Sequence, residues 1–128
     1  MLFRSNPAYR TAVGKALLSR QLTTIAEVEQ WIGSRQLDPK TPNTLTTAEA
    51  LAKDFDASRA RGYAIDDQEN ELGVNCVALP IFMDGSLTPV GAISVSAVSF
   101  RCPLARLVDA VPDIRATIER HLGANALG

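Results

Sequence analysis

The sequence predicts an α+β protein in which helices flank a mainly antiparallel sheet. Between residues 11 and 62, apolar side chains recur at the three- and four-residue spacing of amphipathic helices. After residue 62 the apolar period changes to two, as in strands, and a helical period returns after residue 103. Because helices precede a group of strands that includes a hairpin, the order is that of an α+β fold.

The first helix is expected over residues 11–21, with Ala12 and Ala16 in its apolar stripe. Gly14 lies inside it, and because glycine weakens a helix, its presence indicates close approach by another group. Lys15 follows this glycine, but the glycine-rich pattern of a phosphate-binding loop is absent. We therefore interpret Lys15 as a surface lysine.

Two further helices begin with the spacing of a capping box, in which a threonine and a glutamate three residues later satisfy each other's backbone N–H groups. The two pairs are Thr24 with Glu27 and Thr46 with Glu49. Each helix is expected to end at a glycine, because glycine readily adopts the conformation that closes a helix. These glycines are Gly33 and Gly62.

The strands are expected around residues 63–65, over 74–83 and over 88–98, the last two forming a hairpin with the turn Asp84-Gly85-Ser86. Pro80 cannot donate a ladder hydrogen bond, so its strand should lie at an edge or carry a bulge there. A three-stranded sheet leaves two edges exposed. We therefore expect that the chain oligomerises through these edges or that the first strands of the domain are missing from it.

The last helix is expected from Leu104 to Leu122, and Pro112 should kink it or split it in two. His121, the single histidine, lies in its final turn. A cation suits the C-terminal end of a helix, so we interpret this residue as structural.

Composition excludes several classes of protein. The 128 residues suffice for one domain, and 13 Lys plus Arg against 14 Asp plus Glu give a net charge of −1, so a cationic field for nucleic acid is absent. Cys76 and Cys102 are too few for a disulfide scaffold or a four-ligand zinc site. Neither a signal peptide nor a membrane-spanning stretch is evident. We expect a cytoplasmic protein without membrane contact, metal or cofactor.

An acidic cluster is expected on the loop that follows the first strand. It contains Asp66, Asp67, Glu69 and Glu71. Their spacing does not match a calcium-binding loop. We interpret them as solvated charges, with one aspartate at the rim of a ligand site as the alternative.

One thiol and two hydroxyls are expected on one face of the hairpin. With a three-residue turn, Cys76 lies opposite Ser94 and diagonal to Ser96, among small residues. Such a wall leaves space in which short polar groups can hold a small oxygen-rich ligand. The alternative is that the small residues lie under a packed helix and the serines bond the backbone.

Several motifs together resemble the effector-binding domain of IclR-type transcriptional regulators. They occur in the family's order and spacing, as TAVGKALL (11–18), RGYA (61–64), ELG (71–73), CVALPIF (76–82), AISVS (92–96) and HLG (121–123). The resemblance implies a GAF-like or profilin-like sensor domain, of which residues 1–128 are a part that is truncated at its N-terminal side. Operator DNA would be bound only through a winged helix-turn-helix domain that this chain lacks.

The resemblance also implies a function. Family members bind a small organic acid or related metabolite over the sheet, assemble as homodimers or homotetramers, and so modulate DNA binding of the full-length repressor or activator. The positions that line this pocket match Asp66, Cys76, Ser94 and Ser96. Ala12, Val13 and Gly14 match the helix start whose N–H groups meet the effector's carboxylate, a role that suits a helix N-terminus.

Two alternatives to a sensor without catalytic residues stay open. One is an enzyme that uses Cys76 as its nucleophile, which would need a base or a cation beside the thiol. His121 could serve only if the last helix packs over that strand. The other is a purely structural oligomerisation fragment.

Overall fold

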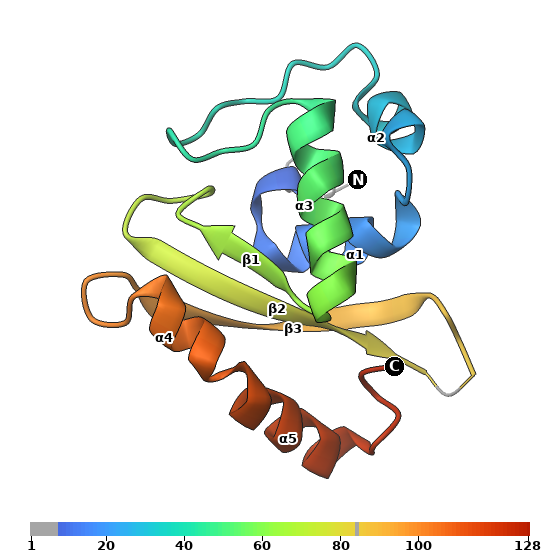
Figure 1. Ribbon diagram of the computed structural model, residues 1–128, viewed down its shortest axis with the longest axis vertical. Coiled ribbons are helices and arrows are strands. Elements are labelled where there is room, and N and C mark those ends of the chain that lie inside the picture. The colour runs from blue at the N-terminus through green and yellow to red at the C-terminus, as the bar shows by residue number, and fades with distance from the viewer. Residues whose placement is uncertain (1–7, 84) are drawn as a thin grey trace.

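A computed structural model describes residues 8–83 and 85–128, so Asp84 of the expected turn lies outside the described residues. In Figure 1 a sheet separates α1, α2 and α3 on one face from α4 and α5 on the other. The elements, in chain order, are η2 (Ala8–Arg10), α1 (Ala12–Gln21), α2 (Ile25–Ile32), α3 (Ala48–Arg61), β1 (Ala64–Asp67), β2 (Val74–Phe82), β3 (Pro89–Val98), α4 (Leu104–Asp109) and α5 (Val111–Leu122). The predicted α+β class is confirmed.

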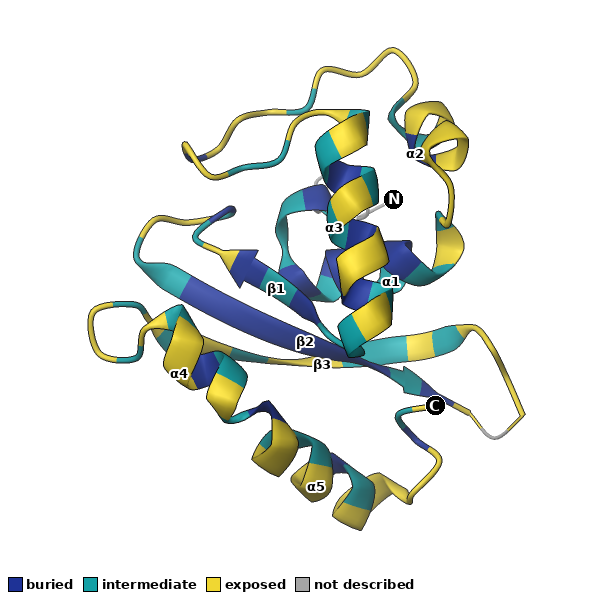
Figure 2. Ribbon diagram, in the orientation of Figure 1, coloured by how far each residue is buried: buried dark blue, intermediate teal, exposed yellow. Residues whose placement is uncertain are grey.

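The sheet has the order β1-β2-β3, and both strand pairs are antiparallel. The central strand β2 is the most buried of the three, as Figure 2 shows. The first strand is longer than the sequence predicts, because Asp66 pairs with Cys76 and Asp67 with Asn75. The expectation that both aspartates lie on a loop is therefore wrong.

The hairpin register differs from the predicted one by two residues. Cys76 lies opposite Ser96, and Ser94 lies opposite Ala78. The connection spans residues 83–88, because the Ser86 hydroxyl both donates to the Thr88 carbonyl (3.0 Å) and accepts from the Thr88 N–H (3.1 Å). These bonds fold residues 86–88 into the loop and keep them out of the ladder.

Pro80 lies on the central strand, at a place where only one side of that strand is paired. β1 begins with Ala64 opposite Ala78, so it does not extend as far as Pro80, and a register irregularity follows between Ile81 and Phe82. Beyond the irregularity, the Phe82 N–H donates to the carbonyl of Ala126 in the C-terminal tail (2.8 Å). The proline is thus accommodated beside a bulge, one of the two expected solutions.

Helix starts agree with the sequence except at α3. Thr24 and Glu27 form the predicted capping box, with both reciprocal bonds present. The predicted box of Thr46 and Glu49 is wrong, because the chain stays extended through Thr47, whose side chain caps the helix by accepting from Ala50 N–H (3.2 Å). Glu49 then falls at the second helical position, one residue too early for a capping box.

Helix ends are where the sequence places them. Gly33 (φ 60°) and Gly62 (φ 88°) close α2 and α3 with positive φ, which glycine adopts without steric cost. Pro112 splits the C-terminal helix into α4 and α5 and lies in the first turn of α5. There its missing N–H removes no helical hydrogen bond.

Small residues let α1 lie directly on the sheet. Its Ala12 and Ala16 form one buried cluster with Ala64, Cys76 and Ala78. Gly14 meets the predicted close approach, since a Cβ there would lie 2.3 Å from the carbonyl oxygen of Ala8. The opposite face of the sheet carries larger apolar side chains, with Val77, Leu107 and Val111 at the centre of its cluster.

Candidate functional site

A polar row crosses the sheet on the face that α1 covers. It consists of Asp66, Cys76 and Ser96, which lie opposite one another on β1, β2 and β3. The Cys76 Sγ and the Ser96 Oγ are 3.1 Å apart and share a hydrogen bond. Because the register differs from the prediction by an even number of residues, the thiol and both serines still share one face.

The row runs from a covered end to an open end. Asp66 and Cys76 are buried, with exposed fractions of 5% and 9%, whereas Ser94 and Ser96 on the edge strand are exposed. Over β1 and β2, the alternative that a helix packs on the small residues is therefore what the structure contains. On β3, Ala92 still packs against the α1 cluster, whereas Ser94 and Ser96 on the same face are exposed to solvent.

The start of α1 offers fewer N–H groups than expected. The Thr11 hydroxyl caps the helix by accepting from Gly14 N–H (3.1 Å). The Gly14 Cα faces the Ala8 backbone. Ala12 and Val13 carry the remaining first-turn N–H groups, which a helix cannot bond internally. Of the three residues assigned to carboxylate binding, Ala12 and Val13 therefore have an N–H group without a partner within the helix, although Ala12 is only 1% exposed.

Asp66 is held as a hydrogen-bond acceptor. Its Oδ1 accepts from the Glu69 N–H at 2.7 Å. Burial raises the pKa of Asp66, while its hydrogen bond to Glu69 N–H and the positive charge of Lys15 oppose that rise. A buried carboxylate at one end of the row favours a ligand that donates a hydrogen bond there.

A buried ion cluster lies beside the row, formed by Lys15, Glu69 and Asp54. The side chain of Lys15 is completely buried, and its Nζ lies 2.7 Å from Glu69 Oε1 and 2.9 Å from Asp54 Oδ2. The contact with Glu69 is a hydrogen bond, whereas Asp54 Oδ2 has the proximity of an ion pair without hydrogen-bond geometry. Burial raises the pKa of Glu69, an effect that Lys15 opposes.

This cluster corrects two predictions. Lys15 is not a surface lysine, and Asp66 and Glu69 are not solvated charges. The physical reason is that Lys15 and Glu69 pair with each other across two elements and Asp66 accepts from the Glu69 N–H, which offsets the cost of removing these groups from water. A signal was present in the sequence, because Ala12, Lys15, Ala16 and Ser19 have the spacing of one helix face and all are buried.

The Cys76 nucleophile hypothesis lacks its expected base. Cys76 faces α1, whereas α5, which carries His121, packs on the opposite face of the sheet (Figure 1). His121 is exposed and its Nδ1 lies 2.9 Å from the carbonyl oxygen of Thr117. Within residues 8–83 and 85–128, no group of three or more His, Cys, Asp or Glu side chains is arranged to hold a metal ion.

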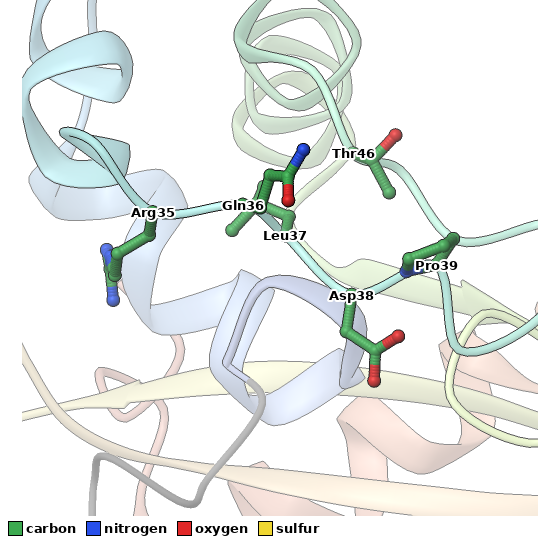
Figure 3. Close-up of a pocket in the computed structure, with 6 residues that line it drawn as sticks. All are labelled: Arg35, Gln36, Leu37, Asp38, Pro39 and Thr46. Carbon is green, nitrogen blue, oxygen red and sulfur yellow. The ribbon is translucent and has the colours of Figure 1, made fainter.

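Two surface depressions lie away from the polar row. The larger, of about 560 Å³, is lined by Arg35 to Pro39 and by Thr46, as Figure 3 shows. The other lies between the start of α2 and α3. No residue of the polar row lines either of them. In the described part of the chain, none of the helices is both long and apolar enough to span a bilayer.

Relatives of known sequence match over most of the chain. The HTH-type transcriptional regulator XynR of Escherichia coli K12 is 36% identical over 106 residues, which are 83% of this chain and 41% of XynR. The regulator KdgR of the same strain is 35% identical over 108 residues, or 84% of this chain and 40% of KdgR. The names of both as transcriptional regulators support the prediction that the chain is not an enzyme.

Solved structures have the same fold. The C-terminal domain of E. coli KdgR matches with a TM-score of 0.73 and 31% identity, over 92% of this chain and 70% of that one. The inducer-binding domain of the transcription factor PobR from Acinetobacter, a double mutant in complex with 3-hydroxybenzoic acid, matches with a TM-score of 0.76 and 28% identity. That match covers 91% of this chain and 65% of the PobR chain.

The chain spans less than half the length of the curated relatives it matches. The family model described as "Bacterial transcriptional regulator IclR C-terminal" matches residues 3–120, nearly the whole sequence. Fold, sequence relatives and family model therefore agree, and the chain belongs to the C-terminal domain family of IclR-type transcriptional regulators.

Proposed function

We propose that this domain senses a small organic acid or related metabolite and, in a full-length cytoplasmic regulator, passes that signal to a DNA-binding domain. The observation that carries the proposal is the polar row of Asp66, Cys76 and Ser96, which runs from beneath α1 to the open edge of the sheet. The complex of PobR with 3-hydroxybenzoic acid supports an organic acid as ligand.

The ligand would lie across the polar row with its anionic group at the start of α1. Ser94 and Ser96 would donate to its oxygens, and the N–H groups of Ala12 and Val13 would meet its carboxylate. Asp66 would accept from a hydroxyl or amide at the other end. This orientation follows from charge, because the only cation of the neighbouring cluster already faces two carboxylates.

The same proposal places the sensing site in a larger domain. The chain corresponds to 70% of the solved KdgR C-terminal domain. Residues 85–100, which include β3, contain no charged side chain, so little in this edge strand opposes pairing with another segment. We propose that further strands of the domain, absent from this sequence, cover the edge and complete the site above Ser94 and Ser96.

A thermal-shift titration tests this function. The probes represent four classes of organic acid: pyruvate for small keto acids, gluconate for sugar acids, allantoate for ureides and 3-hydroxybenzoate for aromatic acids. A ligand of the folded chain raises its melting temperature by mass action, by an amount that grows with concentration. We expect a dose-dependent shift that disappears in Ser96→Ala and persists in Ser34→Ala, an exposed loop serine outside the row. A shift that Ser96→Ala leaves unchanged would contradict the assignment of the site.

An oligomerisation module is the second candidate function. The observation that favours it is the apolar hairpin, where Met83, Leu87, Val90 and Val98 are exposed. In this case a homodimer or homotetramer would form at the same concentration with and without the probes. The sensor predicts that the bound probe changes the dissociation constant of the oligomer.

A further inference from the structure

Lys15 joins three separate parts of the fold. It lies on α1, its partner Asp54 lies on α3, and its other partner Glu69 lies on the segment that follows β1. No part of its side chain reaches solvent, although its Nζ is charged. Lysine is rarely buried completely, so a buried lysine with partners on two other elements calls for a physical explanation.

Stability alone is not a sufficient reason. Taking Lys15 and Glu69 out of water has a cost that their attraction often only balances, and apolar side chains of similar volume commonly serve as well. What an ion cluster adds is directional: charged groups on separate elements have few arrangements in which all are paired. The cluster therefore fixes where α1 lies relative to the segment after β1.

That segment leads directly to the polar row. Glu69, which holds the Lys15 ammonium through Oε1, accepts from Asp67 N–H through Oε2 (3.1 Å) and donates its own N–H to Asp66 (2.7 Å). On the other side, Lys15 is followed by Ala16, which packs in the cluster that contains Cys76. The ammonium group of Lys15 therefore links α1, which packs over Cys76, to Glu69, which holds Asp66.

We propose that Lys15 is a positioning residue of the effector site, whose ammonium clamps α1 to the segment after Asp66 and so holds the helix over the polar row. This inference rests on the proposed function. The positive charge of Lys15 also opposes the rise that burial causes in the pKa of Asp66, and so favours the carboxylate form that accepts hydrogen bonds. Lys15 touches no ligand in this scheme and acts through Glu69 and α1.

The labelling rate of Cys76 tests the clamp without any ligand. In a Cys102→Ser background Cys76 is the single thiol, and it is buried beneath α1. Because Cys76 is only 9% exposed, iodoacetamide reacts much faster when the helix lifts or the whole chain unfolds. The rate, followed by mass spectrometry, is compared with the free energy of unfolding from urea titrations. Lys15→Met removes the charge and keeps a long side chain, and Val28→Ala is the control.

Val28 suits the control because it lies on α2 and is fully buried in the cluster between the helices, which contains no residue of the polar row. Its truncation lowers global stability without touching the site. We expect Lys15→Met to label about tenfold faster than its loss of global stability accounts for, because α1 then opens locally. Val28→Ala should label only as fast as its lost stability predicts. If Lys15→Met followed the same relation as Val28→Ala, its role would be structural only and the proposal overturned.

A second variant covers the case in which Lys15→Met does not fold. Glu69→Gln keeps the pair of Lys15 with Asp54 and removes the charge from the arm that leads to Asp66. It should also label faster than its global stability predicts, and labelling that only follows global stability would refute the clamp. The assay is independent of the proposed function. Excess labelling together with a failed probe panel supports the clamp and counts only against the choice of ligand.

Discussion

At the scale of single residues, Gly14 illustrates how one missing side chain positions an element. An alanine in the interior of an exposed helix is about 1 kcal/mol more favourable than glycine. Here the added Cβ would lie 2.3–2.7 Å from backbone atoms of Ala8, which cannot move as a flexible side chain can. We expect Gly14→Ala to lower the free energy of unfolding by about 1–3 kcal/mol, typical of overpacking, as measured by urea unfolding.

Gly91→Ala is the matched control for this substitution. A Cβ at Gly91 would meet no atom within 4 Å, and its φ is not positive. Its effect should stay within about 0.5 kcal/mol. Equal stability of Gly14→Ala and the unmodified chain would mean that Ala8 and α1 are not in close contact.

Asp66 gives a prediction about pH. Burial raises its pKa above the ordinary value of 3.8, so the folded chain holds this proton more tightly than the unfolded chain does. The contribution of Asp66 to stability therefore falls as pH rises from 3.8 through the folded pKa. Asp66→Asn removes this loss and keeps an oxygen for the Glu69 N–H. The variant should gain in stability relative to the unmodified chain as pH rises from 4 to 7.

Thermal melts across this pH range give the difference in stability between Asp66→Asn and the unmodified chain. In this difference the titration of Glu69 and of the other shared groups cancels to first order. If that difference were constant with pH, or if Asp66→Asn became relatively less stable towards pH 7, the raised pKa of Asp66 would be contradicted.

The burial of Lys15 could not be predicted from the local sequence. The spacing of Ala12, Ala16 and Ser19 with Lys15 predicts a shared face. Yet a lysine on such a face is buried only if carboxylates from distant elements converge on it. Asp54 and Glu69 lie 39 and 54 positions further along the chain, so no local pattern connects them with Lys15.

At the scale of elements, the corrected start of α3 can be measured directly. Thr47, not Thr46, accepts the hydrogen bond that caps the helix. Removing an N-cap hydroxyl costs about 1 kcal/mol, so Thr47→Ala should lower the free energy of unfolding by that amount. Thr46→Ala serves as its matched neighbour and should change stability by less than about 0.5 kcal/mol. The reverse order in urea unfolding would restore the start that the sequence predicts.

Elements are predictable where the signal is local. The cap of α2, the closing glycines Gly33 and Gly62, and the split at Pro112 depend on residues within a few positions of one another. The register of the hairpin could not be predicted in this way, because it depends on the bonds between Ser86 and Thr88 and on the bulge near Phe82. The candidate site kept its common face because the register error was even.

At the scale of the whole molecule, the edge of β3 is where we expect association. Val90 is 61% exposed on this uncharged edge. Long apolar edge strands without charges pair with other chains, and a lysine on the edge opposes such pairing. We expect this chain to associate with rising concentration in sedimentation velocity, and Val90→Lys to shift the population towards monomer.

The control is Leu122→Lys, which places the same charge at an apolar residue that is 53% exposed at the end of α5. This variant should associate as the unmodified chain does. A similar shift in both variants would assign the effect to net charge rather than to the β3 edge.

The most direct test of the account is to map a bound probe onto the chain. Amide resonances of the 15N-labelled protein are followed by NMR while the probe that gives the largest thermal shift is added. A ligand held as proposed will shift the amide signals of Ala12, Val13, Cys76 and Ser96. Shifts confined to residues 35–39 and 46, around the surface depression, would place binding elsewhere. Unchanged spectra with this probe would contradict sensing by this chain.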